Sequence, residues 1–496
     1  MGADTPTEQD LLLPGDIEQR SSVAHNSRTG SFNDTEHGKE VVVLGDEPRR
    51  RSIFNDVGAI VLGTCIMLSL ATILFLPSGS REDPRSPVPT TISQRVDRIL
   101  EETPLIDGHN DLAILIRFLH KNKIYDSNFT KPFVEGGMYG HVDLPRLKEG
   151  KNGGAFWSAY APCPKNGTDF SDENYAETVA FTYSQIDVLT RLRGAYPDVF
   201  SPPPNSSTAL SAFKSHQLIS PLAIEGLHQI GNSLSNLRNY YALGARYATL
   251  THNCHNMYAD AALLETPTGV IPSTPLHHGV SPAGRLLIHE MNRLGMIIDL
   301  SHVSPDTMRD VLGGSSPSAS TWPGSSAPVI FSHSSAHALC PHPRNVPDSI
   351  LHLVQQRNSL VMVNFSPDFV SCVANPSDPT GLPSFYAPNS TLAHVVSHIM
   401  HIGDLIGYEH VGLGSDFDGI LNTPRGLEDV SKYPDLLAEM LRRGVSDTDA
   451  AMVVGGNVLR LWAEVDRVAL EMQRAGVKPV EDELPALHLV SATGSE

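Results

Sequence analysis

The sequence predicts an α/β fold: a (β/α)8 barrel with insertions, preceded by a disordered tail and one transmembrane helix. Three observations support this prediction. Short apolar runs alternate with amphipathic segments along most of the chain, and such alternation favours parallel strands joined by helical crossovers. A charge-free segment of helical length lies near the N-terminus. The 496 residues are 40% hydrophobic and 18% charged, a globular composition that excludes a wholly disordered or collagen-like chain.

The predicted disordered tail comprises residues 1–56, which are rich in Ser, Asp, Glu, Gly and Asn and show no helical or strand period. Residues 57–76 contain no charge and are followed by Pro77. A helix of this length, rising about 1.5 Å per residue, spans a bilayer core of about 30 Å. A buried soluble helix is disfavoured because a polar tail and the Pro/Ser/Arg-rich linker 77–95 flank the segment. A cleaved signal peptide would start near residue 1.

Charges beside this segment predict its orientation. Arg49, Arg50 and Arg51 precede it, which favours a cytosolic tail and a large extracellular or lumenal domain, as in a single-pass type II membrane protein. An acidic-dileucine-like string, residues 8–13, leaves vacuolar or endosomal sorting open. Four glycosylation acceptor patterns agree with a lumenal domain. They begin at Asn128, Asn166, Asn205 and Asn389.

The cysteine content predicts disulfides, and the net charge argues against nucleic-acid binding. Besides Cys65 in the apolar segment, four cysteines remain, and an even number in an oxidising compartment predicts two disulfides. They are Cys163, Cys254, Cys340 and Cys372. The net charge of −19 makes nucleic-acid binding an improbable main function. Membrane contact is expected through the N-terminal helix alone, and a homodimer remains possible.

Eight apolar runs are the predicted strands of the domain 96–476, which is followed by a C-terminal tail, 477–496. The runs are 104–109, 154–161, 219–225, 247–252, 296–302, 329–333, 359–365 and 410–416. Helix-like stretches lie between most of them or follow the last. These stretches include 177–193, 235–243, 281–294, 392–406, 435–443 and 458–474. Eight strand–helix units fit a closed barrel better than an open doubly wound sheet, which remains the alternative. No GxGxxG or GxxxxGK[ST] string follows a predicted strand, so nucleotide binding is not expected.

Six of the eight runs end in a residue that can bind a metal. The carboxyl ends of parallel barrel strands share one rim, so groups far apart in sequence can converge there. Imidazole and carboxylate suit Zn²⁺. His109 and Asp111 are two positions apart, so on a strand both would face the same side, although a turn with an Asx cap is the alternative. The same spacing puts Asp416 and Asp418 on one face. The run-end residues are His109 with Asp111, Glu225, His252, His302, His333, and Asp416 with Asp418.

These motifs resemble the membrane (renal-type) dipeptidase family of zinc metallopeptidases, relatives of the amidohydrolase barrels. The resemblance covers residues 96–470 in one order and does not include the tail or the membrane segment. The family often carries a C-terminal lipid anchor; residues 487–496 offer no hydrophobic tail, so the N-terminal span is expected to replace it. The motifs are IDGHNDL (106–112), GAFWSAYAPC (154–163), AIEG (223–226), TLTHNC (249–254), IDLSHVS (298–304), VIFSHSSA (329–336), RNVPD (344–348), GSDFDG (414–419) and GLEDVSKYPD (426–435).

The resemblance implies a site of two zinc ions. His109 and Asp111 match ligands of one ion, His302 and His333 match ligands of the other, and Glu225 matches the carboxylate that bridges them. It also implies three further roles. His252 matches a residue that polarises the scissile carbonyl, Arg344 one that binds the substrate carboxylate, and Asp416, rather than Asp418, the proton carrier. The implied disulfides are Cys163–Cys254 and Cys340–Cys372.

The expected activity is zinc-dependent hydrolysis of dipeptides by a metal-bridging hydroxide, with Asp416, His252 and Glu225 as the catalytic residues. Two alternatives use the same fold. A related barrel could act on a lactam or cyclic amide, and a membrane receptor could keep the barrel without activity, although all five ligand positions are filled. A Ser-His-Asp hydrolase is disfavoured because no GxSxG elbow follows a strand. The sequence sets no preference among dipeptide side chains or stereoisomers.

Overall fold

The computed structural model describes residues 91–314 and 322–483. Its centre is a closed barrel of eight strands in the order β1-β12-β9-β8-β7-β4-β3-β2, with neighbouring strands parallel. Each of the eight predicted runs overlaps one of these strands, although β1, β2 and β4 extend beyond their runs, so the predicted (β/α)8 barrel is confirmed. The barrel strands are β1 (Leu105–Asn110), β2 (Asn152–Ser158), β3 (Leu222–Glu225), β4 (Ala245–Thr249), β7 (Ile297–Asp299), β8 (Ile330–Phe331), β9 (Leu360–Val363) and β12 (Val411–Leu413).

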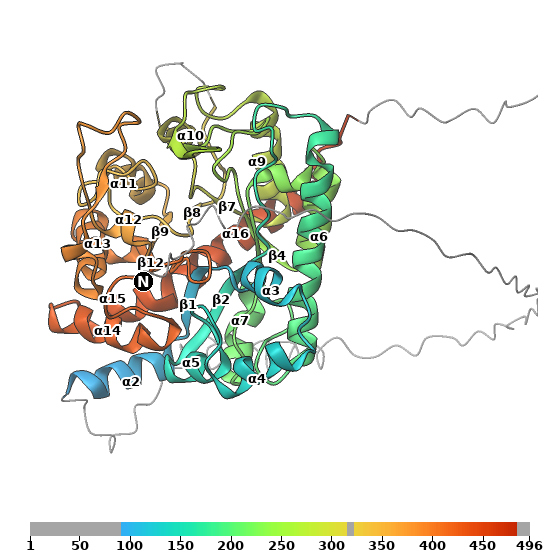
Figure 1. The fold of residues 1–496 in the computed structure, drawn as a ribbon. Helices are drawn as coiled ribbons and strands as arrows, with labels where there is room; N and C mark the ends of the chain where they lie inside the picture. Colours follow the sequence, from blue (N-terminus) through green and yellow to red (C-terminus); the bar gives the residue numbers. More distant parts are fainter. Residues whose placement is uncertain (1–90, 315–321, 484–496) are drawn as a thin grey trace, which may run out of the picture. The chain divides into compact units, whose positions relative to one another are not determined.

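Helices surround the barrel and connect its strands (Figure 1). The six helical stretches expected from the sequence correspond to α6, α8, α9, α13, α14 and α16. The helices are α2 (Ile92–Glu102), α3 (Leu112–His120), α4 (Ser127–Glu135), α5 (Leu144–Glu149), α6 (Asp172–Ala195), α7 (Ser206–Lys214), α8 (Leu234–Leu243), α9 (Pro282–Leu294), α10 (Pro305–Val311), α11 (Asp348–Gln356), α12 (Pro367–Val370), α13 (Leu392–Ile406), α14 (Tyr433–Arg442), α15 (Asp447–Ala451) and α16 (Asn457–Arg474).

The predicted disordered tail, the membrane segment 57–76 and most of the linker lie outside the described residues. Within the described part, no helix combines the length and apolar character needed to span a bilayer. The two predicted disulfides are present: Cys163 pairs with Cys254, and Cys340 with Cys372. Two antiparallel hairpins are insertions outside the barrel. They are β5–β6 (Leu263–Thr266 with Gly269–Pro272) and β10–β11 (Cys372–Val373 with Ser384–Phe385).

Helix α9 shows how local sequence sets the ends of an element. The Ser281 side chain accepts a hydrogen bond from the Gly284 N–H, and Pro282 occupies the first turn, where a missing N–H costs nothing. Gly295 ends the helix in a left-handed conformation, with φ of 84°, that favours glycine. The strand β7, with its metal-binding candidates beyond it, follows directly.

The barrel interior is a packed apolar core. One buried cluster joins side chains from strands around the barrel with residues of α16, and strands on opposite sides can share such a cluster only through the interior. Within it a ladder of rings runs from Trp462 of α16 through Phe156 to Tyr247, with centroid distances of 5.5 and 5.2 Å. The Tyr247 hydroxyl then reaches His109. The core thus supports the rim on which the candidate ligands lie.

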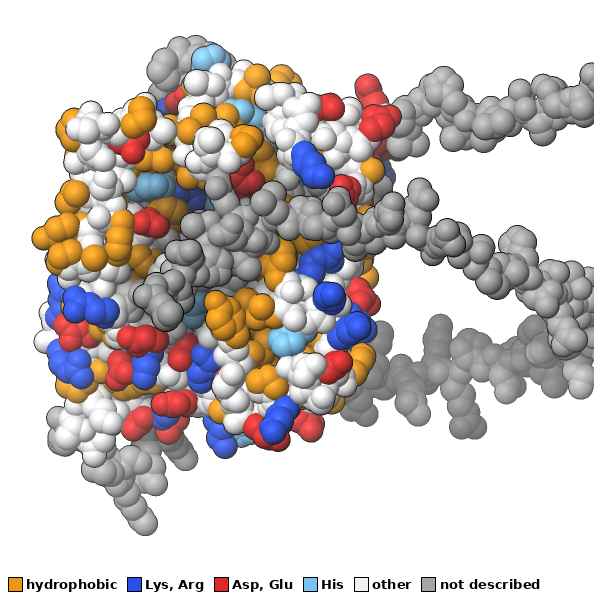
Figure 2. Space-filling view, in the orientation of Figure 1, with side chains coloured by type: hydrophobic (Ala, Val, Ile, Leu, Met, Phe, Trp, Pro, Cys, Tyr) orange, Lys and Arg blue, Asp and Glu red, His pale blue; other side chains and the backbone are white. Residues whose placement is uncertain are grey.

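The surface carries mixed charge. Acidic and basic side chains are interspersed on the face drawn in Figure 2, with hydrophobic side chains between them.

Candidate metal centre

The predicted metal ligands converge at the carboxyl-end rim of the barrel. His109 lies in β1, and Glu225 is the last residue of β3. His302 and His333 follow the ends of β7 and β8. Ligand atoms of His109, Asp111 and Glu225 lie within 4.8 Å of one another. The His302 and His333 Nε2 atoms are 3.0 Å apart. Five residues spread over the chain therefore form one buried group.

Asp111 reaches this group by a route that differs from the sequence argument. We expected His109 and Asp111 to face the same side of one strand, but β1 ends at Asn110 and Asp111 occupies the N-cap position of α3. The Asx interaction belongs to Asn110, whose side chain accepts from the Leu112 N–H at 3.1 Å. Asp111 makes no side-chain cap, and its Oδ2 lies 3.0 Å from His109 Nε2. The alternation argument was wrong in geometry, although the two side chains do meet.

Glu225 lies between the two halves of the group. Its Oε2 is 3.5 Å from His109 Nε2, while its Oε1 is 3.1 Å from His302 Nε2 and 3.5 Å from His333 Nε2. Each carboxylate oxygen thus faces a different half. Burial raises the pKa of Glu225, but His109 and His302 outweigh it and hold that pKa well below its usual range. The arrangement is that of a carboxylate able to bridge two cations.

Each histidine is oriented by a hydrogen bond at Nδ1, which leaves Nε2 facing the centre. The Tyr247 hydroxyl lies 2.6 Å from His109 Nδ1 and donates to the Gly108 carbonyl, so it accepts from the ring. His302 Nδ1 pairs with Asn253 Oδ1 at 3.0 Å. Such partners fix the tautomer of a metal-binding histidine. No local pattern marks Tyr247 or Asn253 as an orienting residue, because each reaches its histidine only through the fold.

His333 is oriented through a longer chain of contacts. Ser332 Oγ lies 2.8 Å from His333 Nδ1 and donates to Asp299 Oδ2 at 2.6 Å. Burial is the largest cause that holds the pKa values of His302 and His333 well below their ordinary range. Both rings are therefore neutral, as metal binding requires. His302 also adopts a left-handed backbone with φ of 66°, a strained conformation of the kind that concentrates at functional sites.

Asp416 and Asp418, which the sequence left as competitors, point to different surroundings. Asp416 shares a cluster with His109 and His333, and its Oδ2 accepts a hydrogen bond from Asn364 Nδ2 at 3.0 Å. Burial raises the pKa of Asp416 to about 7. Nearby carboxylates also raise this pKa, whereas His109 lowers it. Asp418 instead accepts from the His141 N–H at 2.6 Å. Asn364 begins an Asn-X-Ser pattern of the kind that accepts glycans, but its side chain is buried.

Arg344 is a buried cation beside these carboxylates. The residue is 2% exposed, and Nε, Nη1 and Nη2 have no hydrogen-bond partner among the described residues. Burial lowers the pKa of Arg344 to about 10, while Asp416 and Glu225 oppose that shift. The guanidinium lies 5.1 Å from the ring centroid of Phe369. A buried guanidinium whose three nitrogens have no hydrogen-bond partner among the described residues is complementary to an incoming carboxylate.

His252 lies beside His302, beyond the end of β4. Its ring centroid is 4.4 Å from that of His302 and 5.0 Å from that of Tyr160. Nδ1 lies 3.4 Å from Glu265 Oε1. Burial lowers the pKa of His252, but Glu265 and Glu225 oppose it and the net direction is upward.

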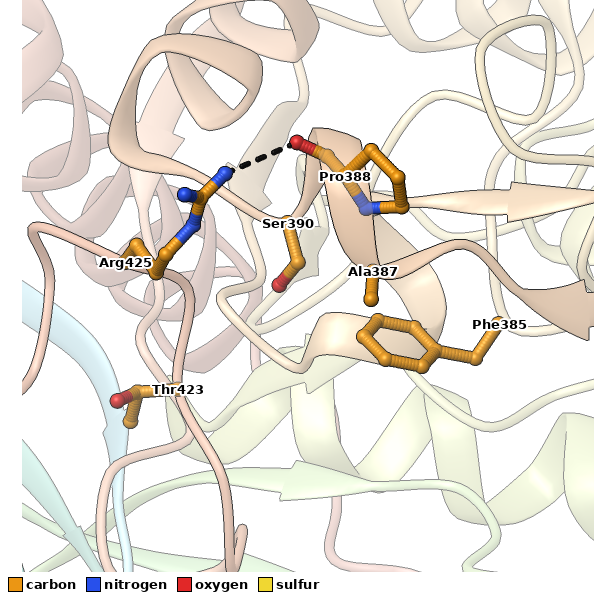
Figure 3. Close-up of a pocket in the computed structure, with 6 residues that line it drawn as sticks. All are labelled: Phe385, Ala387, Pro388, Ser390, Thr423 and Arg425. Carbon is orange, nitrogen blue, oxygen red and sulfur yellow. Dashed lines mark hydrogen bonds between the residues drawn. The ribbon is translucent and has the colours of Figure 1, made fainter.

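A separate pocket of about 440 Å³ lies around the β10–β11 hairpin (Figure 3). Arg425 Nη2 donates to the Pro388 carbonyl at 3.1 Å across it. None of its lining residues is a candidate ligand or catalytic residue. They are Phe385, Ala387, Pro388, Ser390, Thr423 and Arg425.

Known proteins resemble this chain over its whole barrel. Residues 93–476 match the family model described as membrane dipeptidase (peptidase family M19). Dipeptidase aclJ of Aspergillus oryzae is 44% identical over 391 residues, which are 78% of this chain and 84% of that protein. Dipeptidase tcpJ of Claviceps purpurea is 42% identical over 382 residues, with 77% and 81% covered.

Solved structures agree. A metallo peptidase from Rhodobacter sphaeroides, liganded with a phosphinate mimic of the dipeptide L-Ala-D-Ala, superposes with a TM-score of 0.58 at 25% identity, covering 73% of this chain and 99% of that one. The probable dipeptidase PvdM from Pseudomonas aeruginosa shares the fold, with a TM-score of 0.65 at 21% identity over 77% of this chain and 100% of that one. The chain therefore belongs to the membrane dipeptidase family, peptidase family M19, and is a hydrolase of peptide bonds.

Proposed function

We propose that this enzyme hydrolyses dipeptides at a centre of two zinc ions, and that Arg344 binds the free carboxylate of the substrate. The buried guanidinium carries the proposal, because its three donors have no partner among the described residues and it lies beside the ligand group. A substrate carboxylate would supply that partner. A fixed carboxylate site close to the reacting centre restricts substrates to short peptides.

The donor set fits zinc. Three imidazole nitrogens face the centre with two carboxylates, and Asp111 Oδ1 is buried without a hydrogen-bond partner among the described residues. His109 and Asp111 would hold one ion, His302 and His333 the other, and Glu225 both. Bound zinc would polarise the peptide carbonyl and supply a nucleophilic hydroxide near neutral pH.

The remaining steps belong to the chain's own side chains. Asp416 would accept a proton from the nucleophile and pass it to the leaving amine, a role supported by its position within the cluster of His109 and His333. Asn364 holds the Asp416 carboxylate in place. His252 is placed to donate to the oxygen on which negative charge develops.

The proposal extends to the setting of the enzyme. All four glycosylation candidates, Asn128, Asn166, Asn205 and Asn389, are exposed, and both disulfides support an oxidising compartment. We therefore infer an extracellular or lumenal catalytic domain held by the N-terminal segment 57–76, in a vacuolar, endosomal or other membrane. A shift in electrophoretic mobility after glycosidase treatment of membrane-fraction protein tests this setting.

The activity is tested with zinc-loaded enzyme and L-Ala-D-Ala, L-Ala-L-Ala, L-Ala-L-Ala-amide and a cyclic amide without a carboxylate. We expect rapid cleavage of a free dipeptide, little of its amide, and about two zinc ions per chain. Preference for the cyclic amide would favour a lactam-type hydrolase. Absence of hydrolysis with bound zinc would favour an inactive receptor.

A further inference from the structure

His252 follows β4 in a segment without regular secondary structure, so the backbone alone does not fix its ring. The nearby disulfide between Cys163 and Cys254 anchors the main chain two residues further on. The Asn253 carbonyl accepts a hydrogen bond from the Glu265 N–H at 2.9 Å, which ties the segment to the β5–β6 hairpin. These contacts hold the backbone and leave the orientation of the imidazole to its side-chain neighbours.

The neighbours of the His252 ring differ on its two sides. A ring nitrogen lies within 4.8 Å of ligand atoms of Glu225 and His302. On the other side, Nδ1 faces Glu265 Oε1 at 3.4 Å and Cys163 Sγ at 3.8 Å. A carboxylate only accepts hydrogen bonds, whereas a disulfide sulfur is a weak acceptor. Glu265 is therefore the stronger partner for an Nδ1–H donor.

Glu265 is held well enough to act as an orienting group. Its side chain is 32% exposed, and β5 pairs with β6 through four residue pairs, including Glu265 with Val270. Burial raises the pKa of Glu265, but His252 lowers it further, so the carboxylate stays ionised near neutral pH. At His109, His302 and His333 a partner at Nδ1 likewise orients the ring, but there Nε2 offers a lone pair to a metal, whereas Nε2 of His252 must carry a proton to donate.

We propose that Glu265 is a positioning residue that accepts a hydrogen bond from Nδ1 of a doubly protonated His252, so that the Nε2–H is directed toward the scissile carbonyl oxygen. This inference rests on the proposed dipeptidase function. It assigns a catalytic purpose to the β5–β6 hairpin, which lies outside the barrel. The 3.4 Å separation is expected to shorten when substrate binds, as catalytic hydrogen bonds commonly do.

The test uses the full-length, zinc-loaded enzyme with L-Ala-D-Ala and a double-mutant cycle. We expect Glu265→Ala to lower kcat roughly 10- to 100-fold with KM and zinc content within about twofold of wild type. Glu265→Gln keeps an acceptor oxygen and should recover most of kcat. In a His252→Ala background, Glu265→Ala should have no further effect on kcat, because its partner is gone. Val270→Ala, an exposed residue of the same hairpin, should match wild type.

Several results would overturn the inference. Wild-type kcat in Glu265→Ala would show that the ring is oriented without it. Glu265→Ala could lower kcat by the same factor in the His252→Ala background as in the wild type, or Val270→Ala could lower kcat as much as Glu265→Ala does. Either result would assign the effect to the hairpin as a whole. A wild-type enzyme that leaves dipeptides intact would overturn the proposed function and this inference together. An active wild type with an unaffected Glu265→Ala variant would overturn the inference alone.

Discussion

Replacement of Asp416 by Asn should remove activity and, in the metal-free protein, increase stability at alkaline pH. Burial raises the pKa of Asp416 from an ordinary 3.8 to about 7. The proton is therefore bound more tightly in the folded chain. The stabilisation from that proton is fully present below pH 3.8 and is lost as pH rises through about 7. An amide at this position does not titrate and avoids the loss.

The size of the effect follows from the pKa. One pH unit corresponds to about 1.4 kcal/mol, so the advantage of Asp416→Asn over wild type should grow by at most about 4 kcal/mol between pH 4 and pH 8. For a barrel of this size that is a rise in Tm of roughly 5 °C. The substitution is otherwise mild: an amide oxygen can still accept from Asn364. Asn also tolerates the left-handed backbone at Asp416, with φ of 66°.

Thermal unfolding of chelator-treated protein, followed by circular dichroism at several pH values, measures this difference. Asp418→Asn is the matched control. Asp418 accepts from the His141 N–H at 2.6 Å, and a neutral amide oxygen accepts more weakly than a carboxylate, so its replacement should lower Tm slightly at pH 8 rather than raise it. A Tm difference between Asp416→Asn and wild type that is the same at pH 5 and pH 8 would refute the linkage argument. Zinc-loaded Asp416→Asn should keep its metal and lose most of kcat.

Three further predictions concern single features of the fold. Arg344→Met should lower kcat/KM for L-Ala-D-Ala roughly 100-fold, mainly through KM, and slightly raise Tm, because it removes an unpaired buried charge. Equal losses on a dipeptide and its amide would contradict this. Replacing both Cys340 and Cys372 by Ala opens a loop of 32 residues and should lower the free energy of unfolding by about 3–4 kcal/mol in urea titration. Gly414→Ala should destabilise severely, since its Cβ would collide with the Ser332 carbonyl oxygen; soluble protein with wild-type Tm would argue otherwise.

The barrel could be predicted because its strands are buried on both faces and so read as short apolar runs. The five ligands could be predicted because they follow those runs, and parallel strands bring their ends to one rim. Asp111 shows where this reasoning fails. Strand alternation put it beside His109, but the strand ends one residue earlier, and Asp111 reaches His109 from the N-cap position of α3. Where a strand ends and a helix begins, a residue can follow the two-residue repeat of the strand or the 3.6-residue repeat of the helix, and the sequence does not decide between them.

The groups that orient the ligands could not be predicted. Tyr247 lies within a predicted strand as one more large residue, and only barrel closure brings its hydroxyl to His109. Glu265 lies in a hairpin for which no expectation existed. Asn364 resembled a glycosylation acceptor, yet its amide holds Asp416. These contacts join residues far apart in sequence, so no local pattern marks them.

Two buried aspartates connect the barrel itself to the chemistry at its rim. Asp107 of β1 accepts from the Ser415 N–H at 2.8 Å and from its hydroxyl at 2.5 Å. Asp299 of β7 accepts from the Ser332 N–H at 2.8 Å and from its hydroxyl at 2.6 Å. In both cases a carboxylate in one strand fastens the turn after its neighbour, and the next residue in that turn is Asp416 or His333. Because strand pairing sets these positions, the site is organised by the same contacts that close the barrel.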